Sequence, residues 1–337
     1  MTESAISFVG VWSVIIATGV FLYVLLDGFD LGIGILHGFA ADDAHRQLMM
    51  ASIAPVWDGN ETWLVFGGLA LLTAFPLAFA IIIPAVYFPI LVMLVALAFR
   101  GVAFEFRFQN PGSRAFWDRA FHFGSIVATF AQGLVLGAFI QGFRVDGRQF
   151  SGSAFDFLTP FSVMTGLALV FAYALLGAGW LILKTDGALQ AWARRAGRVC
   201  LLVVFLAVVT VYVWTPLLEP TVARRWASWP DVLFQVPVAL LTVAVCVWEW
   251  RALAGSKDAS PFAVAILLFL LSYLGFAISL WPMVVPYRFT LWEAASPPST
   301  QAFLLVGTLF MLPVILMYSG WSYWVFRGKV RRDLGYH

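Results

Sequence analysis

The sequence predicts an all-α integral membrane protein with about eight transmembrane helices. Of its 337 residues, 62% are hydrophobic and only 11% are charged, whereas soluble domains carry about 25% charged residues because a water-facing surface requires them. Several apolar runs also reach the roughly 20 residues that a spanning helix needs. The 32 Phe and 15 Trp fit helices in lipid with aromatic residues at the interfaces. No basic cluster accompanies a recognition element, so no nucleic-acid partner is expected.

Polar stretches and stretches rich in Pro and Gly separate the predicted spans, as helix ends require. The eight spans cover residues 8–36, 78–99, 120–142, 160–183, 199–218, 231–250, 261–284 and 302–326. By helix count the chain divides into two four-helix halves, 1–184 and 185–337.

Basic residues predict the orientation of these spans. Most of the 20 Lys and Arg follow the second, fourth, sixth and eighth spans, and the positive-inside rule places those loops in the cytoplasm. Both termini are then cytoplasmic. The opposite side holds the remaining basic residues, which are Arg46, Arg144, Arg148, Arg224, Arg225 and Arg288.

Residues 48–77 do not fit this pattern simply. They are apolar enough for a ninth span, but they contain Asp58, Asn60 and Glu61. A ninth span would only move Arg46 to the cytoplasmic side, so the charge count does not exclude it. We expect an amphipathic or partly re-entrant segment, because two carboxylates near its start are costly in lipid.

The first polar cluster lies within 27–34, where Asp27 and Asp30 are three residues apart on one helix face. Gly28 and Gly32 form a small-xxx-small pair that lets a neighbouring helix approach closely. The carboxylates could form a polar helix contact or an ion path, or they could be hydrated at the outer interface. Their position does not choose between these alternatives.

The second cluster runs from Trp57 to Trp63. Asp58 and Glu61 share a face if the segment is helical, and a buried carboxylate could relay protons. The alternative is a helix start, with Asp58 as the N-cap and Glu61 three residues later in a capping box. The residues taken alone favour the helix start.

The third cluster is Arg100–Arg107, where two arginines flank Glu105. This pattern indicates either an ion pair between these residues or a basic anchor at the cytoplasmic end of a span.

Haem ligation inside a bilayer requires two facing His, or His with Met, and none of the four histidines is predicted at mid-membrane depth. The sequence has no Cys-x-x-Cys, no phosphate-binding loop and no metal-spaced His pair. Cys200 and Cys246 are expected to be buried thiols. The residues alone therefore indicate no metal site, redox centre or hydrolytic site.

The three clusters, in this order, resemble subunit II of the cytochrome bd-type quinol oxidases. Residues 27–34 read Asp-Gly-Phe-Asp-Leu-Gly-Ile-Gly, 56–64 contain Trp-Asp-Gly-Asn-Glu-Thr-Trp, and 100–107 read Arg-Gly-Val-Ala-Phe-Glu-Phe-Arg. The chain length is similar to that of the cyanide-insensitive branch.

The resemblance implies a respiratory complex of the bacterial inner membrane that oxidises quinol and reduces dioxygen to water. Haems b and d would belong to the partner subunit I, and this chain would hold no catalytic centre of its own. It would support the haem-bearing bundle in contact with lipid and quinol. Some members hold a quinone in subunit II, and a small single-helix subunit is another expected partner.

By the same resemblance, Asp58, with Glu61, would lie on a proton route from the cytoplasm, and Trp63 near a route for oxygen. The predicted topology puts 37–77 on the outer side, which conflicts with a cytoplasmic proton source. The residues expected to serve helix or subunit packing are Asp27, Gly28, Asp30, Gly32, Trp57, Arg100 and Glu105.

Two other functions fit some of these features. In a secondary transporter, the Gly-rich 27–34 stretch would be a broken helix that binds a cation, and Pro76, Pro84 and Pro89 would kink the second span for gating. In a purely structural subunit, Asp58 and Trp63 would have no role in conduction.

Overall fold

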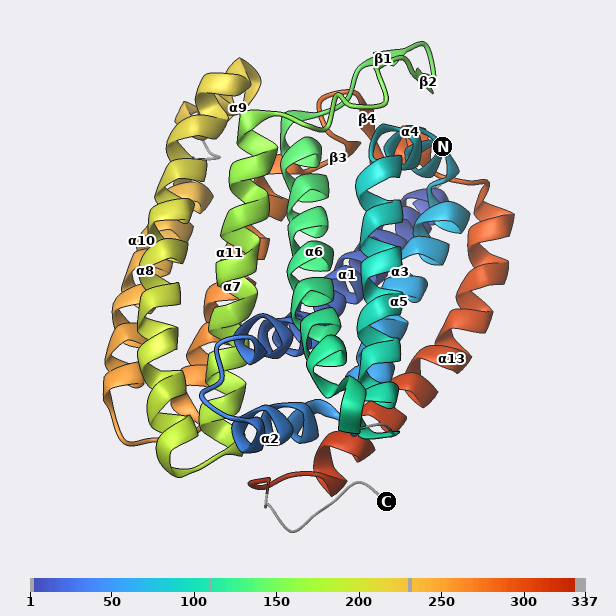
Figure 1. Ribbon diagram of the computed structural model, residues 1–337. Coiled ribbons are helices and arrows are strands. Elements are labelled where there is room, and N and C mark those ends of the chain that lie inside the picture. Colours follow the sequence, from blue (N-terminus) through green and yellow to red (C-terminus); the bar gives the residue numbers. More distant parts are fainter. Residues whose placement is uncertain (1–2, 110, 230–231, 331–337) are drawn as a thin grey trace.

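The computed structural model describes residues 3–109, 111–229 and 232–330, which form a bundle of long helices (Figure 1). In this described part, eight helices are long and apolar enough to cross a membrane, which confirms the predicted number. They lie within α1 (Glu3–His37), α5 (Tyr87–Gln109), α6 (Arg114–Gln141), α7 (Pro160–Lys184), α8 (Gly187–Leu218), α10 (Val232–Ala254), α11 (Ser260–Leu280) and α13 (Pro298–Val325).

Shorter elements connect the long helices. The helical ones are α2 (Asp43–Ile53), α3 (Trp57–Ala74), α4 (Pro76–Ala85), η1 (Pro111–Ser113), α9 (Pro220–Ala227) and α12 (Leu291–Ala294). Two antiparallel hairpins pair β1 (Val145–Asp146) with β2 (Gln149–Phe150) and β3 (Met283–Val285) with β4 (Phe289–Thr290). In the first hairpin Val145 lies opposite Phe150, and in the second Met283 lies opposite Thr290.

Local signals set several helix ends. Thr159 and Ser162 form a capping box at the start of α7, and Asp42 caps α2 by accepting a hydrogen bond from the His45 amide. Gly142 ends α6 at a φ of 78°, a backbone conformation that glycine adopts without strain. The polar and Gly-rich breaks in the sequence thus become the turns of the bundle.

The predicted span 78–99 is divided between two helices. α4 ends at Ala85, Val86 leaves the helical conformation, and α5 begins at Tyr87. Pro89 is the third residue of α5, where its missing amide hydrogen costs no helical hydrogen bond. The spanning helix therefore starts later than predicted and continues to Gln109.

Residues 48–77 differ from the expected re-entrant segment. They contain the end of α2 and the whole of α3, an 18-residue helix of about 27 Å that packs antiparallel along α1. Near its start, Asn60 contacts the Leu26 carbonyl; Gly67 lies beside Val20 further along. At its end, the Ala74 carbonyl accepts a hydrogen bond from the Ser296 amide. α3 therefore passes from one end of the bundle to the other.

This extra pass puts the start of α1 and the end of α13 at opposite ends of the bundle (Figure 1). The eight predicted spans, an even number, had placed both termini on the same side of the membrane. Trp12 of α1 donates to the Gln301 carbonyl near the start of α13, so the two helices run in the same direction. At the other end, Lys184 donates to the Phe326 carbonyl, just beyond α13.

We call the end that holds α2, the start of α3 and the end of α13 the basic end. Arg331 and Arg332 lie outside the described residues. The helix ends and loops there carry Arg46, Arg100, Arg107, Arg114, Arg119, Lys184, Arg194, Arg195, Arg198, Arg251, Lys257, Arg327 and Lys329. The opposite end carries Arg144, Arg148, Arg224, Arg225 and Arg288.

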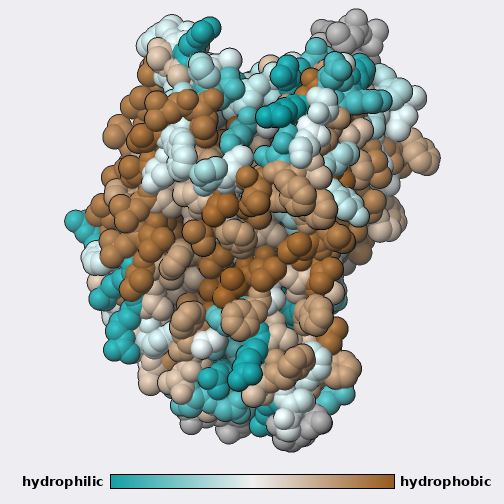
Figure 2. All heavy atoms as spheres, turned by 45° about the horizontal axis from the view of Figure 1, so that its top comes forward, coloured by the Kyte–Doolittle hydropathy of each residue, from teal (hydrophilic) through white to brown (hydrophobic). Residues whose placement is uncertain are grey.

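One apolar core joins the two predicted halves, since it includes Leu31, Leu175, Leu201 and Leu268 from α1, α7, α8 and α11. α13 lies along the outside, and Gln301 is its one buried residue. Figure 2 shows a broad apolar band across the middle of one face, with hydrophilic residues toward the two ends. Such a band is the surface that lipid or a membrane partner covers.

Candidate functional site

Five polar side chains form a buried cluster between α1, α3 and α5, toward the basic end. Asp27, Asp30 and Arg100 are 0% exposed, and Asn60 is 2% exposed. Glu61 is the half-buried member, with 27% of its side chain exposed. We call this group the α1–α3–α5 cluster. It unites residues from all three motifs of the sequence, which α3 and α5 bring against α1.

Arg100 is shared between two carboxylates of this cluster. Its Nη1 lies 3.0 Å from Glu61 Oε1 and 3.5 Å from Asp27 Oδ1. The Trp57 and Phe121 rings each lie 5.9 Å from the guanidinium carbon, a distance at which a cation and a ring attract. Arg100 therefore connects a carboxylate near the surface to one that is fully buried.

The cluster holds more negative than positive groups and keeps free hydrogen-bonding capacity. The Asp27 oxygens, and Nε and Nη2 of Arg100, make no hydrogen bond with the described residues. One guanidinium faces three carboxylates, which are Asp27, Asp30 and Glu61. Carboxylates are groups that exchange protons, so proton transfer is a chemistry that this arrangement offers.

Asp30 is held by a second set of contacts that reaches α13. Asn60 Nδ2 donates to Asp30 Oδ2 at 2.6 Å, and the Tyr323 hydroxyl donates to Asn60 Oδ1 at 2.8 Å. The amide of Asn60 thus bridges α1 and α13. The sequence analysis did not identify Tyr323 as a site residue, because 263 residues separate it from Asn60 and no spacing pattern joins them.

A further polar chain joins α1 to α6 and α7, and it begins at Tyr23, one helical turn before Asp27. Gln132 of α6 donates to the Tyr23 hydroxyl at 2.7 Å and accepts from the Tyr173 hydroxyl at 2.9 Å. These three residues were also missed, because single polar residues in apolar helices form no recognisable spacing.

The structure separates the two carboxylates of the second motif. Asp58 is exposed on the first turn of α3, whereas Glu61 turns toward Arg100. The N-cap residue of α3 is Val56, so the alternative of an Asp58 capping box is wrong. Trp57 stacks on Phe104 with ring centroids 5.3 Å apart.

Trp63 lies inside the bundle. It is 2% exposed, and its ring meets Phe66 edge-on at 5.8 Å. The indole nitrogen has no hydrogen-bond partner among the described residues.

The suggested pairing of Glu105 with Arg100 and Arg107 is wrong. Glu105 is exposed, and Arg107 contacts Asp43 at 2.6 Å and Asp118 at 2.5 Å. Residues two or five apart on a helix do not face each other, so neighbouring helices supply the carboxylates instead.

The glycines of the first motif lie where α1 meets α7. A Cβ atom at Gly32 would overlap the backbone of Tyr173 and Gly177, and one at Gly28 would touch the Tyr173 ring. The backbones of α1 and α7 approach closely there, which keeps Asp27 and Asp30 away from lipid.

The histidines in the described residues are engaged within the chain. His37 is buried and lies 3.4 Å from Asp118, His122 Nδ1 lies 3.1 Å from the Gly34 carbonyl, and His45 lies 3.3 Å from Asp42. In this described part no three His, Cys, Asp or Glu side chains converge as a metal site.

The sequence matches the family model described as cytochrome bd terminal oxidase subunit II over residues 9–326. The chain is 27% identical to cytochrome bd-I ubiquinol oxidase subunit 2 of Escherichia coli K12, over 96% of this chain and 95% of that protein. It is 28% identical to cytochrome bd ubiquinol oxidase subunit 2 of Bacillus subtilis 168, over 95% and 96% of the two chains.

The fold is also similar to a chain in the structure of the bd oxidase from Geobacillus thermodenitrificans. The TM-score is 0.74 at 17% identity, over 93% of this chain and 96% of that one. Eight apolar helices and these bacterial relatives indicate a multi-pass protein of the inner membrane. They support the oxidase function and not the transporter alternative. The chain belongs to the cytochrome bd terminal oxidase subunit II family.

Proposed function

We propose that this chain is subunit II of a complex that oxidises quinol and reduces dioxygen to water, and that it supplies a proton route to a haem-bearing subunit I. Haems b and d, and a small single-helix subunit where one exists, lie outside this chain. The E. coli and B. subtilis relatives are named as ubiquinol oxidase subunits, which supports this proposal.

The sharing of Arg100 between Glu61 and Asp27 is the observation that carries the proton route. Glu61 is partly open to the surface and Asp27 is closed off. A proton that binds at Glu61 weakens its pair with Arg100, and the guanidinium then pairs with the Asp27 carboxylate. When that proton passes on to Asp27, the guanidinium returns to the ionised Glu61. Asp27 is the inner proton acceptor in this sequence of events, and Arg100 offsets the negative charge at each stage.

The basic end faces the cytoplasm in this proposal, by the positive-inside rule. Asp58 and Glu61 lie at that end, so both have access to the compartment that supplies protons for water formation. The difficulty that arose from an outer location for 37–77 does not apply to this arrangement. Asp58, exposed on α3, delivers protons toward Glu61 from the surface.

We assign Trp63 to an oxygen route because its large ring is buried and contacts the Phe66 ring, which suits a non-polar gas. Quinol and lipid contact the apolar band, and a quinone bound by this chain would have to lie there. The two halves, 1–184 and 185–337, support the haem-bearing bundle through the shared apolar core.

The test is turnover of the purified complex with quinol, followed by oxygen consumption. Glu61→Gln and Asp58→Asn remove the charges and keep the shapes, and each should lower turnover by roughly tenfold or more with unchanged haem content. Glu105→Gln is the matched control, because Glu105 is an exposed carboxylate at the same end with no ion pair in the described residues. Normal turnover in Glu61→Gln, with normal assembly, contradicts the route.

A further inference from the structure

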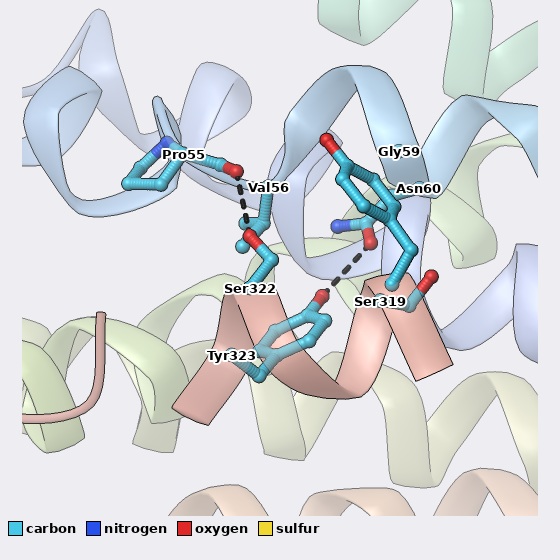
Figure 3. A pocket seen from close by; sticks show the side chains of 8 residues that line it. Pro55, Val56, Gly59, Asn60, Ser319, Ser322 and Tyr323 are labelled. Atoms are coloured by element: carbon cyan, nitrogen blue, oxygen red, sulfur yellow. Dashed lines mark hydrogen bonds between the residues drawn. The ribbon is translucent and has the colours of Figure 1, made fainter. Parts of the chain in front are cut away.

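A small pocket lies between the start of α3 and the end of α13 (Figure 3). The space open to the centre of a water molecule is about 10 Å³, which is the volume that one water needs. The residues that line it are Pro55, Val56, Gly59, Asn60, Tyr318, Ser319, Ser322 and Tyr323.

The lining offers enough polar groups to hold a water. Ser319, Ser322, Tyr323 and Asn60 place hydroxyl and amide groups around the space (Figure 3), and a buried water takes two to four such partners. The Ser322 hydroxyl donates to the Pro55 carbonyl at 3.0 Å. That bond and the bond from Tyr323 to Asn60 hold the end of α13 against α3.

Asn60 belongs both to the wall of this pocket and to the buried cluster. Its Nδ2 donates to Asp30 Oδ2 at 2.6 Å, while its Oδ1 accepts from Tyr323 on the pocket side. Asp30 is 0% exposed, and its Oδ1 has no hydrogen-bond partner among the described residues. A single side chain therefore stands between the pocket and a buried carboxylate with free lone pairs.

We propose that the pocket holds a water that passes protons to Asp30, and that Asn60 is the positioning residue that separates this water from the Asp30 carboxylate. This rests on the proposed function and adds a second entrance beside Glu61. An amide donates hydrogen bonds but does not release a proton near neutral pH, so transfer requires the Asn60 side chain to swing away. A hydronium in the pocket then gives one proton to the Asp30 carboxylate, which becomes a neutral carboxyl, and a water remains behind.

The bond from Tyr323 is what holds Asn60 in the closed position from the α13 side. Its removal should leave Asn60 freer to move, because one hydrogen bond fewer has to break. A larger apolar side chain at Ser319 should instead fill the pocket and exclude the water. The two changes lie on the same helix and are expected to act in opposite directions.

The experiment measures how fast the Asp30 carboxyl exchanges its proton for deuterium in the purified complex. Infrared spectra after transfer to heavy water give this rate, and the Asp30→Asn variant identifies the band. Tyr323→Phe should speed exchange about tenfold, and Ser319→Leu should slow it by a similar factor. Gly320→Leu is the matched control, because that neighbouring position faces open space.

Unchanged exchange in both Tyr323→Phe and Ser319→Leu, with normal haem content, overturns the proposal. So does the absence of an Asp30 carboxyl band in both oxidised and reduced enzyme, because a residue that never holds a proton cannot pass one. The Glu61 route is judged separately by turnover of Glu61→Gln. A failure there leaves the exchange result at Asp30 unaffected.

Discussion

The α1–α3–α5 cluster and Glu249 of α10 bury carboxylates in two different ways. Asp27 is fully buried, but the Arg100 guanidinium lies 3.5 Å away. Glu249 is also 0% exposed, and neither of its oxygens has a hydrogen-bond partner among the described residues. Its neighbours along α10, Val245, Cys246 and Leu253, belong to the apolar core.

The comparison teaches that burial alone does not tell whether a carboxylate stabilises or destabilises the folded protein. Removing one partner of a buried ion pair strongly destabilises the protein, because the other charge stays buried without a counterion. A buried polar group with no partner costs free energy wherever it stands. We therefore expect substitutions in the two regions to change stability in opposite directions.

The largest effect is expected at Arg100. Arg100→Gln leaves the Asp27 and Glu61 carboxylates without a cation and should lower the free energy of unfolding by about 3–5 kcal/mol. The complex should accumulate poorly, with little haem per unit of membrane protein and a lower unfolding temperature. A variant that assembles and unfolds like the wild type would show that the pair with Arg100 does not stabilise the cluster.

The opposite sign is expected at Glu249. Glu249→Leu replaces an unpartnered polar group by an apolar one and should raise the free energy of unfolding by about 1–3 kcal/mol. Thermal unfolding of the purified complex measures this change. Glu249→Gln is the control, since its amide is equally unpartnered and should gain little. A lower unfolding temperature in Glu249→Leu would mean that Glu249 has a partner in the assembled complex.

The smallest effect is expected for a partly exposed pair at the basic end. Asp258 lies 2.6 Å from Lys329 Nζ and 3.1 Å from Arg194 Nη2, and the hydrogen bond from Lys329 lowers the pKa of its carboxyl. Solvent screens such pairs, so Asp258→Asn should cost at most about 0.5 kcal/mol.

This small contribution should also depend on pH. Because the pKa of Asp258 is lowered by folding, its contribution is present above the usual carboxyl pKa of about 4 and is lost as the pH falls through the folded value. Unfolding temperatures of wild type and Asp258→Asn should therefore differ at pH 7 and converge at acidic pH. A difference that persists at low pH would point to packing as its cause.

Much of the fold was predictable because lipid imposes strong limits on a sequence. Eight long apolar helices and the side that carries most basic residues both follow from composition and position along the chain. The motif at 27–34 also predicted close helix packing, and Gly32 lies against α7. The motif at 57–63 contributed Glu61 and Asn60 to the candidate site, although their partners were not foreseen.

What the sequence by itself determined is that this chain is a lipid-embedded helical bundle of the bd oxidase subunit II family. Only the tertiary structure decided that α3 passes through the bundle, because neighbouring helices partly bury Glu61 and supply Arg100 as its counterion. The partners of Asp30 and Arg107, and the burial of Glu249 without a partner, were equally beyond the sequence. Each depends on which faces of distant helices meet, and that is set by the packing of the whole bundle.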